Sequence, residues 1–471
     1  MPSEQNHVIL SRLLRRVKNM SEQRKENKMG VMPVKQLIIS MSLPMMVSML
    51  VQALYNVVDS IFVAKISENA LTAVTLAFPM QNLMIALASG TGVGINSLLS
   101  RSLGEKKYDR SDAAANTGIL LTIMNFVVFL IIGIFGSRAF IASQTSDTAI
   151  IEDGAAYLGI VAALSLGLFC QVTFERLLQS TGRTVYSMIS QLTGAVINII
   201  FDPIMIFGLL GCPKLGVAGA AYATVLGQSI AAVVGLILNI KYNHDIKIRL
   251  SNIFKPKAEI IGQIYMVGVP SILMMSIGSV MTYLMNQILI AFSTTAAAVF
   301  GVYFKLQSFF FMPIFGMNNG VIPVLAYNYG ARNKKRIDDS LKFAFALAII
   351  IMLVGTIVFE LIPGALLKMF DASDDMLAIG IPALRIIAVH FPVAAASIVM
   401  GSIFQAFAKS IYSLFVSIGR QLVVLIPVAY LLSLTGNLNA VWLAFPISEV
   451  VSFILSLVFF KIVYSSTVKK M

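Results

Sequence analysis

The chain has 471 residues, of which 58% are hydrophobic and only 12% are charged. A soluble domain carries roughly 25% charged residues, so this composition, with a mean hydropathy of +0.85, excludes an ordinary soluble protein and indicates one embedded in a bilayer. We expect the formal net charge of +13 to face anionic membrane lipid, and no nucleic-acid partner, because no base-stacking aromatics or folded reading module accompany the charge.

The first 35 residues are polar and carry eight basic side chains. They contain no short apolar core that ends in a small-residue cleavage site, so they are typical of a cytoplasmic tail and not of a signal peptide.

Apolar segments long enough to cross about 30 Å of hydrocarbon occur twelve times in the remaining chain. We expect these spans at 38–63, 71–98, 113–136, 155–179, 184–209, 216–240, 261–291, 297–325, 340–366, 378–405, 410–434 and 438–463.

The two halves of the chain repeat each other at one constant spacing in residue number, which we call the repeat offset. The matched pairs are Pro44 with Pro270, Gln81 with Gln307, Gly90 with Gly316, Gly94 with Gly320, Gly104 with Gly330, Gln179 with Gln405, Tyr186 with Tyr412 and Ser187 with Ser413. Six spans per copy is an even number, so both copies enter the membrane from the same side. We therefore predict an all-α membrane protein in which twelve transmembrane helices form two pseudo-symmetric six-helix lobes, related as parallel repeats.

The lobe boundaries follow from the polar segments. We predict a basic tail at 1–35, a first lobe at 36–240, a linker at 241–259, a second lobe at 260–464 and a tail at 465–471. Of the 35 Lys and Arg residues, 28 lie in the tails or in the even-numbered connections. The positive-inside rule then places both termini in the cytoplasm and the protein in the plasma (inner) membrane.

The sequence contains no motif that favours an enzyme. It has neither a Gly-Lys-Ser phosphate loop, nor a metal-binding His-Glu helix motif, nor a Ser/His/Asp set, so we predict a transporter without a cofactor. Cys170 and Cys212 are the only cysteines and indicate neither a disulfide scaffold nor a metal site. The Gly90, Gly92 and Gly94 string lies inside an apolar span and indicates close helix packing.

Carboxyl groups inside the spans are candidate functional residues, because placing each one at mid-membrane costs about 2.5 to 3.5 kcal/mol. The five are Asp59, Glu175, Asp202, Glu360 and Glu449. Glu360 lies near the outer end of its span, where it can reach the headgroups. Glu175 precedes Arg176, so a local ion pair is the alternative to a binding role.

Two of these acids end polar stripes on predicted helices. One stripe holds Ser48, Gln52, Tyr55 and Asp59, with Asn56 beside it, and the other holds Thr184, Ser187, Gln191, Asn198 and Asp202. Helical spacing places each set on one face, and both acids lie at similar depth, so the stripes can line one cavity. Interhelical hydrogen bonding is the alternative role.

Further polar residues are weaker candidates for substrate binding. Thr224 and Gln228 share one face of the sixth span, and Lys305 and Arg420 are expected as buried cations that could neutralise Glu449. The remaining candidates in the second half are Met285, Asn286 and Gln307.

Over about 33–463 the chain resembles the multidrug and toxic compound extrusion (MATE) transporters. The resemblance lies in Asn56-Val-Val-Asp59, the Gly104-Glu-Lys-Lys-Tyr loop, Asn198 to Asp202-Pro203, and Gly216-Val-Ala-Gly-Ala-Ala. It implies a V-shaped exporter that expels cationic or amphipathic drugs against inward H+ or Na+. We also expect the protein to act as a monomer.

The resemblance assigns roles to named positions of this sequence. It implies a first-lobe cation site at Asp59, Gln52, Asn198 and Asp202, near Thr224, as in members with aspartates in the first and fifth spans. At the end of the fourth span, where related members carry an asparagine, this chain has Glu175. The acids of the sodium site that some members build in the seventh and tenth spans have no counterpart here, and Pro44 resembles a proposed bend point.

Three other functions stay open. A flippase for lipid-linked oligosaccharide would use a cationic cavity, for which Lys305, Arg385 and Arg420 are the candidates. A narrow-specificity metabolite exporter would share the exporter architecture. A membrane-embedded enzyme would need polar chemistry in the loops, which are short here.

Overall fold

The computed structural model describes residues 26–370 and 372–471. Most of the predicted basic tail therefore lies outside the described residues. The helices are α2 Lys28–Val31, α3 Val34–Ala64, α4 Glu68–Gly104, α5 Tyr108–Ile131, α6 Ser137–Ala142, α7 Thr148–Ala163, α8 Leu166–Ser180, α9 Thr184–Phe207, α10 Val217–Tyr242, α11 Leu250–Ile253, α12 Ala258–Ile290, α13 Thr294–Gly330, α14 Lys334–Leu361, α15 Pro363–Lys368, α16 Asp374–Ala388, α17 Phe391–Ala406, α18 Ser410–Ile418, α19 Ile426–Ser433, α20 Leu438–Trp442 and α21 Ala444–Ser466, with π-helical turns at Ile132–Gly136 and Gly419–Leu425.

The number of spans agrees with the prediction. Ten continuous helical segments are long and apolar enough to cross a membrane, and two bent helix pairs bring the total to as many as twelve. The bent pairs are α7 with α8, at 45°, and α16 with α17, at 48°. They lie in the predicted spans 155–179 and 378–405. The bends fall at Leu164 and His390, which are separated by the repeat offset, so the distortion belongs to the repeated unit.

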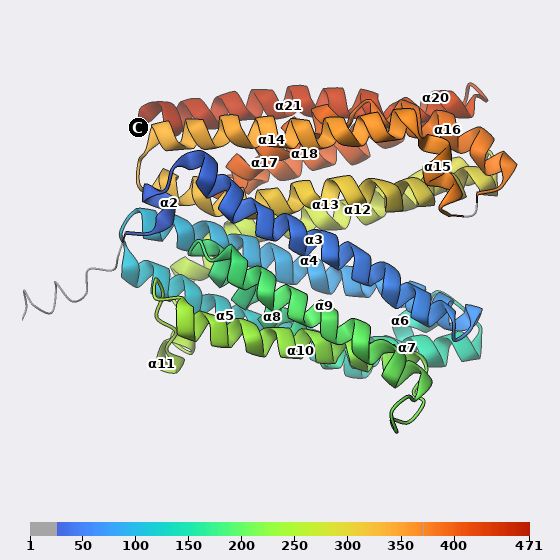
Figure 1. Cartoon of the computed structure of the whole chain (residues 1–471), viewed down its shortest axis with the longest axis horizontal. Coiled ribbons are helices and arrows are strands. Elements are labelled where there is room, and N and C mark those ends of the chain that lie inside the picture. Colours follow the sequence, from blue (N-terminus) through green and yellow to red (C-terminus); the bar gives the residue numbers. More distant parts are fainter. Residues whose placement is uncertain (1–25, 371) are drawn as a thin grey trace, which may run out of the picture.

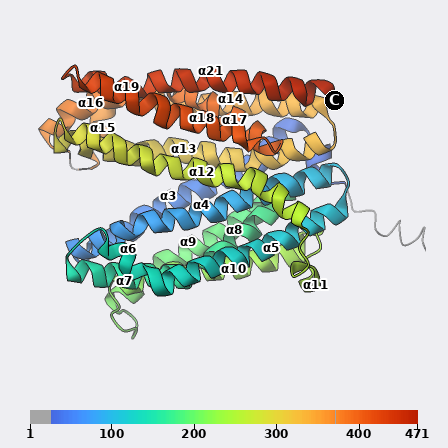
Figure 2. The same ribbon diagram turned by 180° about the vertical axis from the view of Figure 1, so that it is seen from behind.

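The long helices form two groups that lie side by side. Figure 1 shows α4 to α10 in one group, the first bundle, and α13 to α21 in the other, the second bundle. Two helices run obliquely between the groups: α3 contacts α13 and α9, and α12 contacts α4 and α18 (Figures 1 and 2). The predicted lobe boundaries at 36–240 and 260–464 stay predictions.

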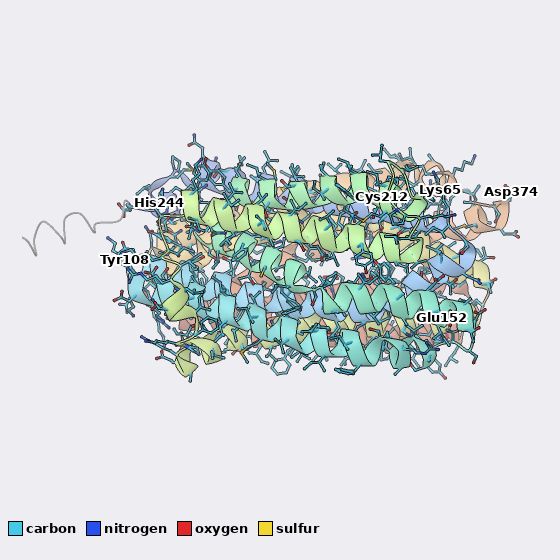
Figure 3. All side chains as sticks on the ribbon, turned by 90° about the horizontal axis from the view of Figure 1, so that it is seen from below. Lys65, Tyr108, Glu152, Cys212, His244 and Asp374 are labelled. Carbon is cyan, nitrogen blue, oxygen red and sulfur yellow. The ribbon has the colours of Figure 1, made fainter. Side chains whose placement is uncertain are left out.

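The two ends of the array differ in charge. Tyr108 and His244 mark one end in Figure 3, and Lys65, Glu152, Cys212 and Asp374 mark the other. We call the first the basic end, because the connections 104–108, 180–184, 242–258 and 330–334 with their Lys and Arg residues lie there.

The repeat extends to backbone conformation. Ser67 and Ser293 are related by the repeat offset, and each caps the next helix by accepting a hydrogen bond of 3.0 Å from a backbone N–H. Lys106 and Arg332 form a second such pair, and both adopt left-handed backbone, with φ of 57° and 53°. Non-glycine residues seldom adopt that conformation. The same unusual turn therefore ends the second helix of each copy.

Glycines let the two copies of the repeat approach each other toward the basic end. A Cβ atom added at Gly94 would lie 2.1 Å from the carbonyl oxygen of Ile264 in α12, and one at Gly320 would lie 2.6 Å from that of Met41 in α3. Gly90 and Gly316 meet the same two helices one turn away. Small residues at this spacing let helix backbones touch, and so the expectation of close packing at Gly90 and Gly94 is confirmed.

A proline in α3 is matched by a contact from a neighbouring helix. Pro44 lies inside the continuous helix and has no N–H, which leaves the carbonyl group of Ser40 without its helical partner. The hydroxyl group of Thr184 in α9 donates to that carbonyl oxygen at 3.1 Å. Freed backbone groups in membrane helices are commonly satisfied in this way.

We expect the glycine crossing to control stability. Gly94→Ala should lower the free energy of unfolding by about 1 to 3 kcal/mol, because the added methyl group overlaps the backbone of α12. Thermal unfolding of the purified protein in detergent measures this loss. Gly262→Ala is the matched control, since no atom of another described helix lies within 4 Å of its added Cβ. Equal melting temperatures for the two variants would contradict the prediction.

Candidate functional site

The structure brings the acids of the two polar stripes together. The carboxyl groups of Asp59 of α3 and Asp202 of α9 lie next to each other, within electrostatic reach. Asp202 is fully buried, and one carboxyl oxygen of Asp59 is buried without a hydrogen-bond partner. Among the described residues, no Lys, Arg or His nitrogen lies within salt-bridge distance of either acid.

An amide joins this acid pair to a third helix. Asn198 lies one turn before Asp202 on α9, and its Nδ2 lies 3.3 Å from Oδ1 of Asp202 and 3.3 Å from Oγ1 of Thr224 on α10. With the amide turned over, Nδ2 donates to Oδ2 of Asp202 at 3.1 Å and the oxygen accepts from the Thr224 backbone N–H at 3.2 Å. In both orientations Asn198 ties Asp202 to Thr224.

A second contact between the stripes lies nearer the basic end. Nε2 of Gln191 on α9 donates to Oε1 of Gln52 on α3 at 2.8 Å. Tyr55 lies between this bridge and the acids, within electrostatic reach of both. Asn56 is exposed, and Gln228, one turn beyond Thr224, is half-buried. The stripes thus form interhelical hydrogen bonds and also surround the acids.

Two residues near the acids were not among the predicted site residues. Tyr157 of α7 is 2% exposed, lies within electrostatic reach of Asp59 and Asp202, and accepts a hydrogen bond of 3.1 Å from Nε2 of Gln81 on α4. The sequence could have indicated Gln81, because it matches Gln307 at the repeat offset. It could not have indicated Tyr157, which is a single aromatic residue in an apolar segment.

Glu175 lies apart from the acid pair. It is buried on α8 about five residues from the basic end, whereas Asp202 is about 18 residues from that end, so at about 1.5 Å per residue roughly 20 Å separate them along the axis. Gln171 donates to the Glu175 carboxylate at 3.0 Å. Arg176 instead donates to Gln179 at 3.0 Å and to Asn319 of α13 at 2.9 Å, so it connects the bundles and makes no ion pair with Glu175.

The second bundle contains a different acid site. Glu449 of α21 is 2% exposed, and one of its oxygens lies 3.2 Å from a guanidinium nitrogen of Arg420. Its other oxygen is buried without a partner, and the buried side chains of Tyr303 and His390 lie within its electrostatic reach. Of the two proposed cations, Arg420 pairs with Glu449.

The expectation that Lys305 is buried is wrong. Its side chain is exposed, and its ammonium group lies 5.9 Å from the centre of the Phe370 ring. The position of Lys305 on the helix explains its exposure. Tyr303 and Leu306 lie on the buried face of α13, so Lys305 lies on the exposed face. Arg385 is also exposed, with a nitrogen 4.0 Å from Glu360.

The other predicted binding residues of the second copy differ in burial. Met285 is completely buried in the hydrophobic core, and Asn286 and Gln307 are half-buried. In the described conformation Met285 is a packing residue.

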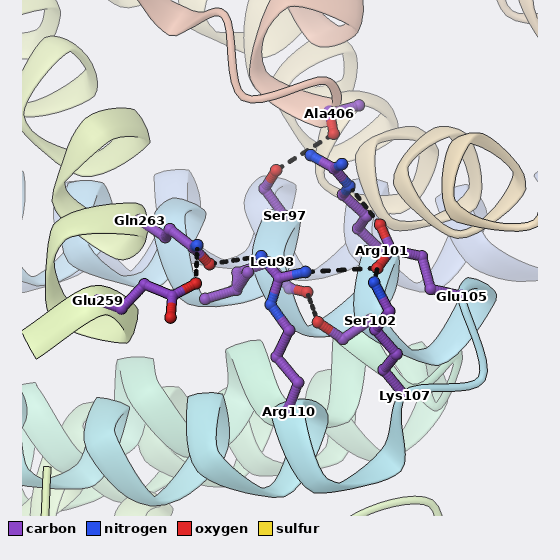
Figure 4. Close-up of polar contacts among 10 residues, drawn as sticks. All are labelled: Ser97, Leu98, Arg101, Ser102, Glu105, Lys107, Arg110, Glu259, Gln263 and Ala406. Atoms are coloured by element: carbon purple, nitrogen blue, oxygen red, sulfur yellow. Dashed lines mark hydrogen bonds and ion pairs between the residues drawn. The ribbon is translucent and has the colours of Figure 1, made fainter. Parts of the chain in front are cut away.

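A polar network holds the basic end together. Figure 4 shows Glu105 accepting from Arg101 at 2.8 Å, from Lys107 at 2.8 Å and from Arg110 at 3.3 Å. Burial acts to raise the pKa of Glu105, but the hydrogen bonds and charges of Lys107 and Arg101 outweigh it, and the pKa lies below its ordinary value. Arg110 also donates to Gln263 of α12 at 2.6 Å, so the network crosses from the first copy to the second.

The repeat equivalent of Arg110 makes a similar crossing. Arg336 of α14 donates to the backbone oxygens of Met29 and Met32 at 3.0 and 2.8 Å, next to the start of α3. Each copy therefore places an arginine against the segment that begins the other copy.

These features are those of a multi-pass membrane transporter: two repeated helical units meet at one end, and the first carries Asp59 and Asp202 within its spans without a basic partner among the described residues. The family model described as MatE matches the chain twice, at 44–204 and 270–431, and the starts of the two matches are separated by the repeat offset. The chain belongs to the MATE family of transporters, and the resemblance noted in its sequence is confirmed.

Named relatives and solved structures agree. The multidrug export protein MepA of Staphylococcus haemolyticus (strain JCSC1435) is 25% identical over 405 residues, which cover 85% of this chain and 88% of that protein. A multidrug resistance MATE family transporter in an outward-facing conformation is 27% identical, with a TM-score of 0.89, over 96% of this chain and 100% of that one. A MOP superfamily transporter from Pyrococcus furiosus, described as having a binding pocket of reverse polarity that suggests a different function, is 26% identical, with a TM-score of 0.86, over 96% and 100% of the two chains.

The pair in the second bundle generates a test of stability. Arg420→Met should destabilise the fold by up to about 3 kcal/mol, because it leaves the buried Glu449 carboxylate without its cation; the 31% exposure of the Arg420 side chain places the loss at the low end for buried pairs. Thermal unfolding measures it.

Arg385→Met is the matched control for this test. Its pair with Glu360 has side chains 52% and 40% exposed, and an exposed pair contributes about 0 to 1 kcal/mol. Equal decreases in melting temperature for the two variants would contradict the prediction, because the Arg420–Glu449 pair would then contribute no more stability than an exposed pair.

Proposed function

We propose that the protein is a secondary active exporter that expels cationic or amphipathic drug-like molecules from the cell in exchange for inward H+ or Na+. The observation that carries the proposal is the contact between Asp59 and Asp202, two acids within the spans, each five residues from the end of its helix and without a basic partner among the described residues. Two carboxyl groups this close in apolar surroundings need a proton or another cation between them.

The coupling follows from competition at this pair. A proton or sodium ion that enters from outside binds between Asp59 and Asp202, and Asn198, Gln52 and Thr224 orient the two acids. Neutralising the acids weakens their attraction for a cationic substrate, which then leaves. Because ion and substrate each bias the same two-state equilibrium, the inward ion gradient drives outward transport.

The membrane orientation is part of the proposal. We assign the basic end, with both termini, to the cytoplasmic side of the plasma membrane, which the distribution of Lys and Arg supports. The close contacts at Gly94 and Gly320 then close the cytoplasmic side, in keeping with the likeness to an outward-facing transporter. Action as a monomer stays a prediction.

The export activity of named relatives supports the substrate class. Multidrug export protein is the description of MepA, and the acids of this chain favour cations by charge complementarity. The Arg420–Glu449 pair leaves the second bundle without a comparable uncompensated charge. Cationic substrates therefore depend on the first bundle.

Uptake of a fluorescent cationic dye into everted membrane vesicles tests the function, with a pH gradient and a sodium gradient imposed separately. Asp202→Asn should reduce gradient-driven uptake by at least about tenfold, equivalent to about 1.4 kcal/mol of coupling, because an amide cannot take up the coupling ion. Asp59→Asn should behave in the same way.

Glu360→Gln is the matched control, because it neutralises a 40% exposed carboxyl group outside the acid pair and should retain uptake. Wild-type uptake by Asp202→Asn at normal expression would overturn the assignment of the coupling site. No uptake by the folded wild-type protein under either gradient would favour a flippase or a narrow-specificity exporter instead.

A further inference from the structure

A pocket of about 640 Å³ lies at the basic end, between the α4–α5 connection, the segment that joins the bundles, and the start of α12. Its walls include five basic side chains, from Lys106, Lys107, Arg110, Lys247 and Lys257. A cavity of this size holds a small organic group. It lies away from the acid pair and is not used in the proposed transport cycle.

Basic side chains outnumber acidic ones in the pocket wall, five against the three of Asp109, Asp112 and Glu259. Asp112 accepts a hydrogen bond of 2.8 Å from the backbone N–H of Lys247, and Glu259 accepts one of 2.8 Å from Gln263. Asp109, the third acid of the wall, is exposed to solvent.

Three ammonium groups remain available in the pocket wall. Among the described residues, no carboxylate lies within salt-bridge distance of the ammonium groups of Lys106, Lys247 or Lys257, whereas Lys107 and Arg110 are held by Glu105. Lysines without an acidic partner around a polar pocket are suited to an anion with several oxygens, such as a phosphate.

A short helix beside the pocket indicates the level of the membrane surface. Leu250 at the start of α11 and Phe254 just after it are 74% and 64% exposed, and Arg249 and Lys255 flank them. Figures 1 and 2 show α11 projecting beside the basic ends of α5 and α10. Exposed apolar residues between basic ones are typical of a segment that rests in the lipid headgroup layer.

We propose that this pocket binds the phosphate-bearing headgroup of an anionic phospholipid. Lys106, Lys247 and Lys257 contact the phosphate, and Leu250 and Phe254 contact the lipid at the membrane surface. Basic pockets at the ends of transmembrane helices provide this kind of site. The proposal holds whichever ion or substrate the transporter uses.

A lipid in the pocket has a consequence for conformation. Lys106 and Arg110 belong to the first copy, whereas Lys257 and Glu259 lie at the start of α12, the first long helix of the second copy. Arg110 donates to Gln263 of α12 at 2.6 Å, so the two sides of the pocket are in contact. A ligand that contacts both sides stabilises the state in which they are together. The bound lipid therefore favours the conformation in which the basic end is closed.

The test measures thermal unfolding of the delipidated full chain in detergent during titration with phosphatidylglycerol, phosphatidylcholine, or glycerol 3-phosphate. Phosphatidylglycerol should raise the melting temperature, and phosphatidylcholine, which has no net charge, should not. A triple variant with Lys106→Gln, Lys247→Gln and Lys257→Gln should bind phosphatidylglycerol about 100-fold more weakly, at roughly fivefold per lysine.

The matched control removes three exposed lysines from the same end of the molecule: Lys334→Gln, Lys335→Gln and Lys342→Gln, none of which lines the pocket. It should keep the wild-type response. An equal loss of phosphatidylglycerol binding in the control would show that positive charge at this end attracts the lipid in general, and would overturn the proposed site. Saturation by glycerol 3-phosphate at the same concentrations would overturn the lipid as ligand in favour of a free phosphate compound.

A second readout does not depend on unfolding. Native mass spectrometry of the wild-type protein should detect retained phosphatidylglycerol, and Lys257→Glu, which reverses a charge on an exposed side chain, should release it. Retention of the lipid by Lys257→Glu at the wild-type level would contradict the proposed site.

Discussion

Backbone contact between the two copies of the repeat at four glycines is the constraint on which the rest of the structure depends. Gly90 and Gly94 bring α4 against α12, and Gly316 and Gly320 bring α13 against α3, so each copy packs against the oblique helix that begins the other. Lipid is as apolar as the helices, which leaves close packing and hydrogen bonds to hold them together. These crossings lie toward the basic end, where Arg110 and Arg336 add polar contacts between the copies.

The same oblique path of α3 positions the acid pair. Near the basic end α3 packs against α13 of the second bundle, and farther along it packs against α9, where Gln52 meets Gln191 and Asp59 meets Asp202. Because α3 contacts both α13 and α9, a rotation of one bundle against the other changes at least one of these contacts. The acid pair is thus connected mechanically to the closed basic end, which a transporter needs if ion binding is to alter access.

The two copies share a backbone but differ in charge. Caps, left-handed turns and bends recur at the repeat offset, as at Ser67 and Ser293, yet the acid pair of the first copy has no counterpart among the described residues of the second, where Arg420 neutralises Glu449. Backbone features persist because both copies must span and pack in the same way. The side chains in the interior are free to diverge, and they confine the uncompensated negative charge to one bundle.

The sequence by itself determined the membrane class, the twelve spans, the repeat, and the polar faces that end in Asp59 and Asp202, because hydropathy and helical periodicity are local properties. Only the tertiary structure decided which groups meet: that Arg420 pairs with Glu449 while Lys305 is exposed, that Tyr157 joins the acids, and that two spans are bent. Lipid and a neighbouring helix are both apolar, so composition cannot tell a face that meets one from a face that meets the other.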